Sequence, residues 1–288
     1  MNFIADKNYS VEKIKYFWII VLAILFVIAY FPVWKGLVLV WYGSADYSHG
    51  FFIVPFFLYL VWMKRKILKK IAVNPSGKGL FWILCSLLIY IASTYAELKT
   101  LVYLSMIFFL SGNVIYFYGF KILKELLFPF FMLLFMIPVP AQIYSSLTMP
   151  LQLLVSTVST WLSSIINIPI YREGNLIFLP EHPLQVVQAC SGLRSMISLL
   201  TLSAGFGYLT LRSNMLRAIL FCSGIPISIA VNIIRVMVVV FAFYYFDYDL
   251  THGTVHTIFG MAIFILALIF IVGTRGALSV WDRSLTQE

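Results

Sequence analysis

The run "LRAILFCSGIPISIAVNIIRVMVVVFAF", residues 216–243, decides the class of fold. It contains 28 residues and only two charged side chains, Arg217 and Arg235. A helix that crosses a bilayer needs roughly 20 mostly apolar residues, so this run can cross a membrane with some tilt. The rest of the chain is similar, with 62% hydrophobic and 11% charged residues, whereas soluble domains carry roughly 25% charged residues. We therefore predict an all-α polytopic membrane protein in which residues 1–288 form a single integral-membrane domain.

The apolar runs predict about eight transmembrane helices, and we expect the first to be retained rather than removed as a signal peptide, since no small-residue cleavage site follows it. The predicted spans are Tyr16–Trp34, Phe51–Met63, Leu80–Tyr95, Thr100–Tyr118, Ile122–Pro138, Cys190–Leu211, Leu216–Phe243 and Val255–Gly273.

The distribution of basic residues predicts the orientation. Of the 20 Lys and Arg residues, all but five fall at the termini or in loops on one side of the membrane; Lys35, Lys99 and Arg172 fall on the other. Cytoplasmic loops carry the Lys and Arg excess. We therefore expect a multi-pass protein of the inner, cytoplasmic membrane with both termini in the cytoplasm. Because the basic residues are scattered over short loops, we expect the lipid bilayer as partner and no nucleic acid.

Residues 140–189, between the fifth and sixth spans, are predicted to lie outside the cytoplasm. "PAQIYSSLTMPLQLLVSTVSTWLSSIINI" (140–168) has apolar residues at helical spacing with Ser, Thr and Gln between them. This pattern is typical of an amphipathic helix in the membrane interface; a ninth span is the alternative, but it would invert the charge distribution downstream. "IPIYREGNLIFLPEHPLQVVQ" (168–188) alternates apolar and polar residues, which predicts a short β-hairpin on the extracytoplasmic face.

Unusual polar residues gather at one predicted depth. Cys190 and Ser191 open the sixth span at its outer end, and Arg194 follows within about one helical turn. Asn232 and Arg235 lie roughly 24–29 Å along the seventh span, in its outer half. His252 and His256 begin the eighth span at the same side. Three consecutive helices therefore bring a thiol, a guanidinium and an imidazole to the outer interface.

Each of these residues also has a structural interpretation. A lone interfacial cysteine usually packs as a small apolar residue. Arg235 could pair with Asp247 or Asp249, or extend to lipid head groups. His252 and His256, with two aspartates nearby, have a spacing that permits a metal site, but the spacing fixes no third ligand. The three cysteines, at 85, 190 and 222, are too far apart for a CxxC metal site or a disulfide framework. We expect no metal and no cofactor.

Together the three groups favour acyl transfer. A thiolate is a strong nucleophile, and a nearby cation increases its population. A histidine can take the thiol proton and return it to a leaving amine. A guanidinium can stabilise the oxyanion of a tetrahedral intermediate. Such a set can cleave a peptide bond, hold the acyl group as a thioester and pass it to water or another nucleophile.

These residues also occur in segments that resemble a known family. "ACSGLRS" (189–195), "PISIAVNIIRV" (226–236) and "HTIFG" (256–260) resemble the three signature blocks of the exosortase/archaeosortase family, and "YSHGFFIVP" (47–55) and "IPIYREGNLIFLP" (168–180) also look like family segments. The resemblance implies a membrane cysteine transpeptidase with Cys190, Arg235 and His256 as catalytic residues. His256 is preferred to His252 because only His256 has the family's glycine, Gly260, four residues later.

The resemblance also implies the substrates, which are exported surface proteins with a C-terminal sorting signal: a short motif such as Pro-Glu-Pro, a transmembrane helix and a basic tail. The acceptor of the cleaved protein, a lipid, a glycan or water, stays open. Arg194, Asn232, Ser191 and His49 are predicted supporting residues, with a structural role preferred for His49. Two other functions remain alternatives: a transporter or channel, and a non-catalytic component of a surface-polysaccharide export system.

Overall fold

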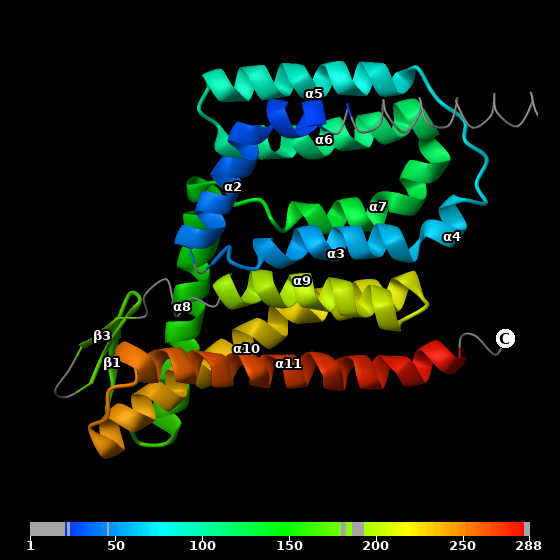
Figure 1. Ribbon diagram of the computed structural model, residues 1–288. Coiled ribbons are helices and arrows are strands. Elements are labelled where there is room, and N and C mark those ends of the chain that lie inside the picture. The colour runs from blue at the N-terminus through cyan, green and yellow to red at the C-terminus, as the bar shows by residue number, and fades with distance from the viewer. Residues whose placement is uncertain (1–20, 22–23, 45, 180–182, 186–192, 285–288) are drawn as a thin grey trace, which may run out of the picture. The chain divides into compact units, whose positions relative to one another are not determined.

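Helices make up most of the chain in the computed structural model (Figure 1). The structure describes residues 21, 24–44, 46–179, 183–185 and 193–284. The chain forms two compact units, residues 1–138 and 139–288.

Four helices in the described residues are long and apolar enough to cross a membrane. They are α5 (Lys78–Tyr95), α6 (Lys99–Tyr118), α10 (Asn214–Phe246) and the segment Gly253–Asp282 of α11 (Gly253–Ser284). All four coincide with predicted spans, which confirms a mostly helical, multi-pass membrane protein. Helices α3 (Gly50–Met63) and α9 (Leu193–Thr210) are also apolar but shorter, so the total of eight spans stays a prediction.

The first unit also contains α2 (Phe31–Gly43), α4 (Arg65–Leu68) and α7 (Phe120–Leu134). Helix α7 ends four residues before the predicted end of the fifth span, Pro138. Two side chains from distant parts of the sequence explain the early end. Trp41 donates its indole N–H to the carbonyl of Met136 at 2.9 Å, and His49 Nε2 bonds the carbonyl of Phe135 at 3.0 Å. These bonds satisfy carbonyls that lack partners within the helix; for Met136 the residue four positions later is Pro140, which has no N–H.

Close backbone contact joins α5 to α6. A Cβ atom added at Gly79 would lie 2.4 Å from the backbone nitrogen of Tyr116, so the two helices approach too closely there for any larger residue. Membrane helices commonly use small residues in this way, because lipid provides no hydrophobic drive for association.

At the end of α3, Lys64 Nζ donates to both the carbonyl and the carboxylate of Glu125 on α7, at 2.6 and 3.0 Å.

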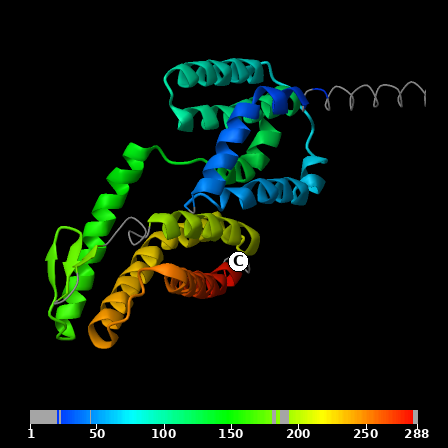
Figure 2. The ribbon, with the colours of Figure 1, turned by 60° about the vertical axis from the view of Figure 1, so that its left-hand side comes forward.

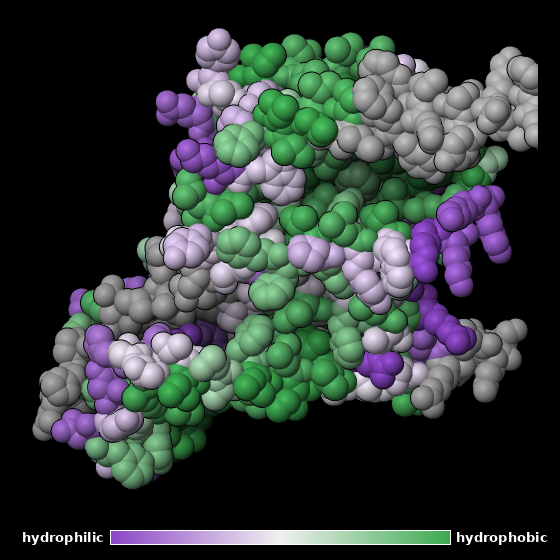
Figure 3. Space-filling view, viewed as in Figure 1, coloured by the Kyte–Doolittle hydropathy of each residue, from purple (hydrophilic) through white to green (hydrophobic). Residues whose placement is uncertain are grey.

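The surface shown in Figure 3 has apolar regions and charged regions. Hydrophilic residues gather at α4, where Arg65 and Lys66 are exposed. Along α11, by contrast, Ile258, Ile265 and Ile269 are each more than half exposed and recur on one helical face. An exposed apolar stripe of this length on a helix long enough to span a bilayer is a lipid-facing surface.

The second unit begins with α8 (Ala141–Ile165) and a three-stranded antiparallel sheet in the order β1 (Tyr171–Glu173), β2 (Leu176–Phe178) and β3 (Pro183–Gln185). Gly174, with φ of 61°, forms the turn between the first two strands. The predicted strand segment is therefore present, with a third strand added to the hairpin. Its position on the extracytoplasmic face stays a prediction.

Helix α8 confirms a helix within residues 140–168, and its polar face is the buried one. Gln152, Ser156 and Ser163 are at most 5% exposed, whereas Leu147 and Trp161 are at least half exposed. The polar face contacts the sheet: Ser156 donates to the carbonyl of Gly174 at 3.3 Å, and Asn175 donates to Gln152 at 3.3 Å. Small polar side chains permit this close packing and leave the apolar face for lipid.

Helices α9, α10 and α11 pack side by side, and α8 packs mainly against α10 (Figures 1 and 2). Ile177 of the sheet packs with Val155 of α8 and with Val236 of α10. Val236 directly follows Arg235 in the sequence. The sheet and α8 therefore pack against α10 next to Arg235.

At the other end of this bundle, Asp282 of α11 holds the turn between α9 and α10. Its carboxylate accepts hydrogen bonds from the backbone N–H groups of Arg212 and Ser213, at 2.9 and 3.0 Å, and the residue is 8% exposed. These N–H groups precede α10, where no intrahelical acceptor is available. The carboxylate also interacts favourably with the positive end of the α10 dipole.

Replacing Asp282 by alanine is therefore expected to lower the melting temperature of the purified protein by about 2–4 °C. Thermal unfolding followed by tryptophan fluorescence in a single detergent measures the change. Ser279→Ala is the matched control, because among the described residues Ser279 bonds within its own helix, to Gly276, and it should leave the melting temperature unchanged. Equal melting temperatures for Asp282→Ala and the control would contradict the capping role.

Candidate active site

The side chains of Arg235 and His256 meet between neighbouring helices. Helix α10 carries Arg235 and α11 carries His256, and Arg235 Nη2 lies 3.2 Å from His256 Nε2. Both residues are partly buried. The two predicted catalytic residues with described side chains are thus in direct contact, although 21 residues separate them in sequence.

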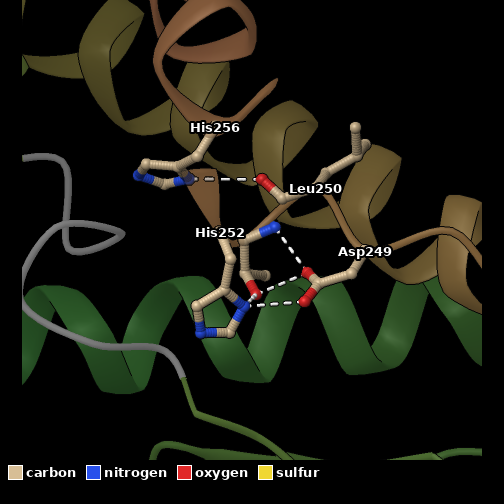
Figure 4. Close-up of polar contacts among 5 residues, drawn as sticks. Asp249, Leu250, His252 and His256 are labelled. Carbon is tan, nitrogen blue, oxygen red and sulfur yellow. Dashed lines mark hydrogen bonds and ion pairs between the residues drawn. The ribbon is translucent and has the colours of Figure 1, made fainter. Parts of the chain in front are cut away.

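The hydrogen bonds of His256 define which ring nitrogen carries the proton. His256 Nδ1 lies 3.2 Å from the backbone carbonyl of Leu250 (Figure 4). A carbonyl can only accept, so Nδ1 carries the hydrogen in this contact. In the neutral ring Nε2 is then the acceptor, and it receives an N–H of Arg235. The arrangement therefore directs the basic nitrogen of the imidazole toward the guanidinium.

A small cavity of about 40 Å³ adjoins Arg235. Ser195 of α9, Ser228 and Asn232 of α10, and Gly260 of α11 line it together with Arg235. Asn232 is buried, at 3% exposed, and shares a helical face with Arg235. The first turn of α9 therefore faces the same cavity as Arg235. From the sequence, a count of residues along each helix predicted only that the two lie at a common depth.

His252 has different surroundings from His256. Its Nδ1 lies 2.7 Å from the carboxylate of Asp249, and its side chain is 85% exposed (Figure 4). Partial burial alone would raise the pKa of Asp249, but hydrogen bonds from Thr251 and the interaction with His252 lower the pKa of Asp249 to about 2. Asp249 is therefore ionised at neutral pH. The geometry separates a histidine that contacts Arg235 from one that belongs to a surface loop.

The remaining predicted site residues are Cys190, Ser191, Arg194 and His49. Cys190 and Ser191 lie outside the described residues, and Arg194 lies in the first turn of α9 with its side chain outside the description. His49 lies in the first unit, where it bonds the carbonyl of Phe135. Burial lowers the pKa of His49 below its ordinary value. It is therefore neutral at pH 7, as a histidine bonded within a protein interior should be.

Sequence reasoning missed Leu250, Thr251 and Ser195. Leu250 acts through its carbonyl, so its side chain gives no signal. The segment "DLTH" at 249–252 did offer one, because Asp and Thr before a helix often form side-chain-to-backbone bonds. Among the described residues, no group of three His, Cys, Asp or Glu residues could hold a metal ion.

Comparison with known proteins found one family. A family model described as "Transmembrane exosortase (Exosortase_EpsH)" matches residues 41–273. The matched region includes Cys190, Arg235 and His256 and all three segments quoted above for the resemblance. No curated protein and no solved structure matches the chain.

Proposed function

Because the chain belongs to the transmembrane exosortase family, we propose that it is a membrane-embedded cysteine protease and transpeptidase with Cys190 as its nucleophile. Family membership supports a membrane transpeptidase in general. The observation that carries the assignment of residues is the contact at 3.2 Å between Arg235 and His256, since this pair supplies the cation and the base that a thiol nucleophile requires.

Chain connectivity supports the assignment of Cys190. It precedes Leu193, the first residue of α9, by three positions, and three residues span at most about 11 Å. Ser195, five residues after Cys190, lines the same cavity as Arg235. On the other side, strand β3 is bonded into the sheet and ends at Gln185, five residues before Cys190. These short connections support the proposal that the Cys190 thiol acts together with the Arg235–His256 pair.

The proposed reaction has two steps. As the N–H of Arg235 leaves His256 Nε2, this nitrogen takes the proton of the Cys190 thiol, and the sulfur attacks the carbonyl carbon of the scissile peptide bond. N–H groups of Arg235 stabilise the negative oxygen of the tetrahedral intermediate. When the intermediate collapses, the C–N bond breaks, the leaving amine takes the proton from His256, and the acyl group stays on sulfur as a thioester. A nucleophilic acceptor then releases the product and regenerates the thiol.

The proposed substrates are exported proteins with a C-terminal motif such as Pro-Glu-Pro, an apolar helix and a basic tail. The distribution of basic residues in the sequence supports a cytoplasmic location for both termini, with the active site on the exterior or periplasmic side of the inner membrane. Arg194, Asn232 and Ser191 are proposed as supporting residues at this site. The acceptor is proposed to be a lipid or glycan nucleophile, or water.

Trapping the thioester tests this proposal. A tagged substrate with motif, apolar helix and basic tail is co-expressed with the enzyme, and the enzyme is isolated at acid pH, where thioesters persist. We expect mass spectrometry to find the substrate's acyl fragment on the peptide that contains Cys190, and neutral hydroxylamine to remove it. A substrate without the short motif is the control and should give no adduct. Continued cleavage with no adduct on Cys190 would reject the thioester mechanism.

A further inference from the structure

We infer that Asp249 is a positioning residue for His256: it closes the turn at residues 249–252 so that the carbonyl of Leu250 receives the Nδ1 hydrogen of the imidazole. This inference rests on the proposed function, because it assumes that His256 Nε2 is the catalytic base. Asp249 itself does not touch substrate. It acts through the backbone of Leu250.

The carboxylate of Asp249 binds three groups of the turn that follows it (Figure 4). Its Oδ1 accepts from the backbone N–H and from the hydroxyl of Thr251, both at 2.6 Å. Its Oδ2 lies 2.7 Å from His252 Nδ1. An aspartate that bonds the backbone two residues later closes an Asx turn. Both carboxylate oxygens are therefore used to hold this short segment.

Leu250 is the residue enclosed by this turn. Its peptide group lies between Asp249 and Thr251, so the bond from Asp249 to the Thr251 N–H restricts the torsion angles that orient the Leu250 carbonyl. That carbonyl lies 3.2 Å from His256 Nδ1. The segment ends at Gly253, where φ is +68°, a value that strongly favours glycine. The turn and the glycine together set the direction in which α11 begins.

The orientation of the Leu250 carbonyl decides the chemistry of the ring. While Nδ1 donates to it, Nε2 of the neutral imidazole carries no hydrogen; its electron pair accepts from Arg235 and can take a proton from a thiol once that N–H moves away. If the carbonyl turned away, the hydrogen could move to Nε2, and the nitrogen nearest Arg235 would no longer act as a base. Among the described residues, Arg235 of α10 contacts His256, and Asp249 and His252 are the charged or titratable side chains that bond within the turn supplying the Leu250 carbonyl.

Three variants of the full-length protein in nanodiscs, each acting on a purified tagged substrate, test this inference. Asp249→Ala removes the turn. Asp249→Asn keeps an oxygen that can accept from the Thr251 N–H and removes the charge. Asp247→Asn is the matched control, because Asp247 lies in the same loop in the left-handed conformation that asparagine also adopts. Rates are divided by the amount of monodisperse protein, so that loss of folded enzyme does not lower them.

We expect Asp249→Ala to reduce kcat about 10- to 100-fold with KM within about twofold, since misorientation of a base slows the chemical step and not binding. Asp249→Asn should recover kcat to within about threefold of the unaltered protein, and Asp247→Asn should match it. An unchanged kcat in Asp249→Ala would overturn the inference. A loss in Asp249→Asn equal to that in Asp249→Ala would also overturn it, because charge and not the turn would then be responsible.

Two additions keep the test decisive. If Asp249→Ala gives no monodisperse protein, Asp249→Glu replaces it: the longer side chain keeps the charge but moves the carboxylate out of register with the Thr251 N–H. A lower kcat then supports the inference and an unchanged one overturns it. Cys190→Ala is measured in the same assay. Cleavage by Cys190→Ala would reject the proposed function itself, whereas an inactive Cys190→Ala beside a fully active Asp249→Ala would reject only the role of Asp249.

Discussion

Replacing Cys190 by alanine is expected to stop substrate cleavage, with a loss of at least about 10⁴-fold in rate. The remaining groups, Arg235 and His256, can polarise a carbonyl and move protons, but without sulfur no acyl-enzyme forms. Water would have to attack the peptide bond directly, and the thioester step that divides a difficult reaction into two easier ones would be lost. The measurement is the fraction of a co-expressed tagged substrate that is processed, read by immunoblot and normalised to the amount of enzyme in the membrane.

The other two cysteines provide the control for this substitution. Cys85 is partly buried in α5 and Cys222 is exposed on α10. Neither is proposed to react, so Cys85→Ala and Cys222→Ala should process substrate at the same rate as the unaltered protein. If Cys190→Ala processed substrate normally, or if Cys222→Ala were the inactive variant, the nucleophile would be misassigned.

Much of the helical architecture could be predicted from sequence because lipid permits few structures. A long apolar run in a bilayer must satisfy its backbone groups internally, and a helix does this locally. The predicted spans Leu80–Tyr95 and Thr100–Tyr118 therefore differ from α5 and α6 by two residues or fewer at each end. The end of α7 was predicted less well, because it depends on Trp41 and His49, which lie 95 and 86 residues from the carbonyls they bond.

The buried face of α8 shows a different limit. Its sequence correctly indicated a helix with one polar and one apolar face, but amphipathicity alone does not say which face is buried. In water the apolar face would be inside. Here Ser156 and Gln152 are buried against the sheet, since in a membrane protein the surroundings can accept the apolar side. Which face of α8 is buried depends on whether water or lipid surrounds the helix, and the residues of α8 alone do not specify this.

The candidate site could be predicted in part by the same reasoning. Counting along predicted helices placed Arg235 and His256 at one depth, and the structure brings them into contact. The depth of a residue does not specify the rotation of its helix about the helix axis. The contact between the two side chains could therefore not be predicted from the sequence pattern. The carbonyl of Leu250 was also inaccessible, because any residue type can supply a backbone acceptor and only the local fold shows where it points.

Replacing Arg235 by lysine is expected to reduce kcat by about 10²–10³-fold, the cost of losing one oxyanion donor at an acyl-transfer site. Lysine keeps the positive charge. However, its single ammonium group lacks the planar fork of donors that lets one guanidinium bind two partners at fixed angles. In the proposed mechanism Arg235 bonds His256 Nε2 before the proton transfer and directs its N–H groups at the developing oxyanion after it. The measurement is kcat with purified enzyme and tagged substrate, with the amount of monodisperse protein determined for each variant.

Arg217→Lys is the matched control for Arg235→Lys. Arg217 lies on the same helix and bonds the carbonyl of Leu211 and the side chain of Asn214, at 2.9 Å each, so it stabilises the start of α10 and not the candidate site. We expect Arg217→Lys to keep kcat within about twofold, because Arg217 lies roughly 27 Å from Arg235 along α10. If Arg235→Lys retained kcat as Arg217→Lys does, a positive charge alone would suffice at position 235. Arg235 would then stabilise the bundle near His256, and the oxyanion would require another donor.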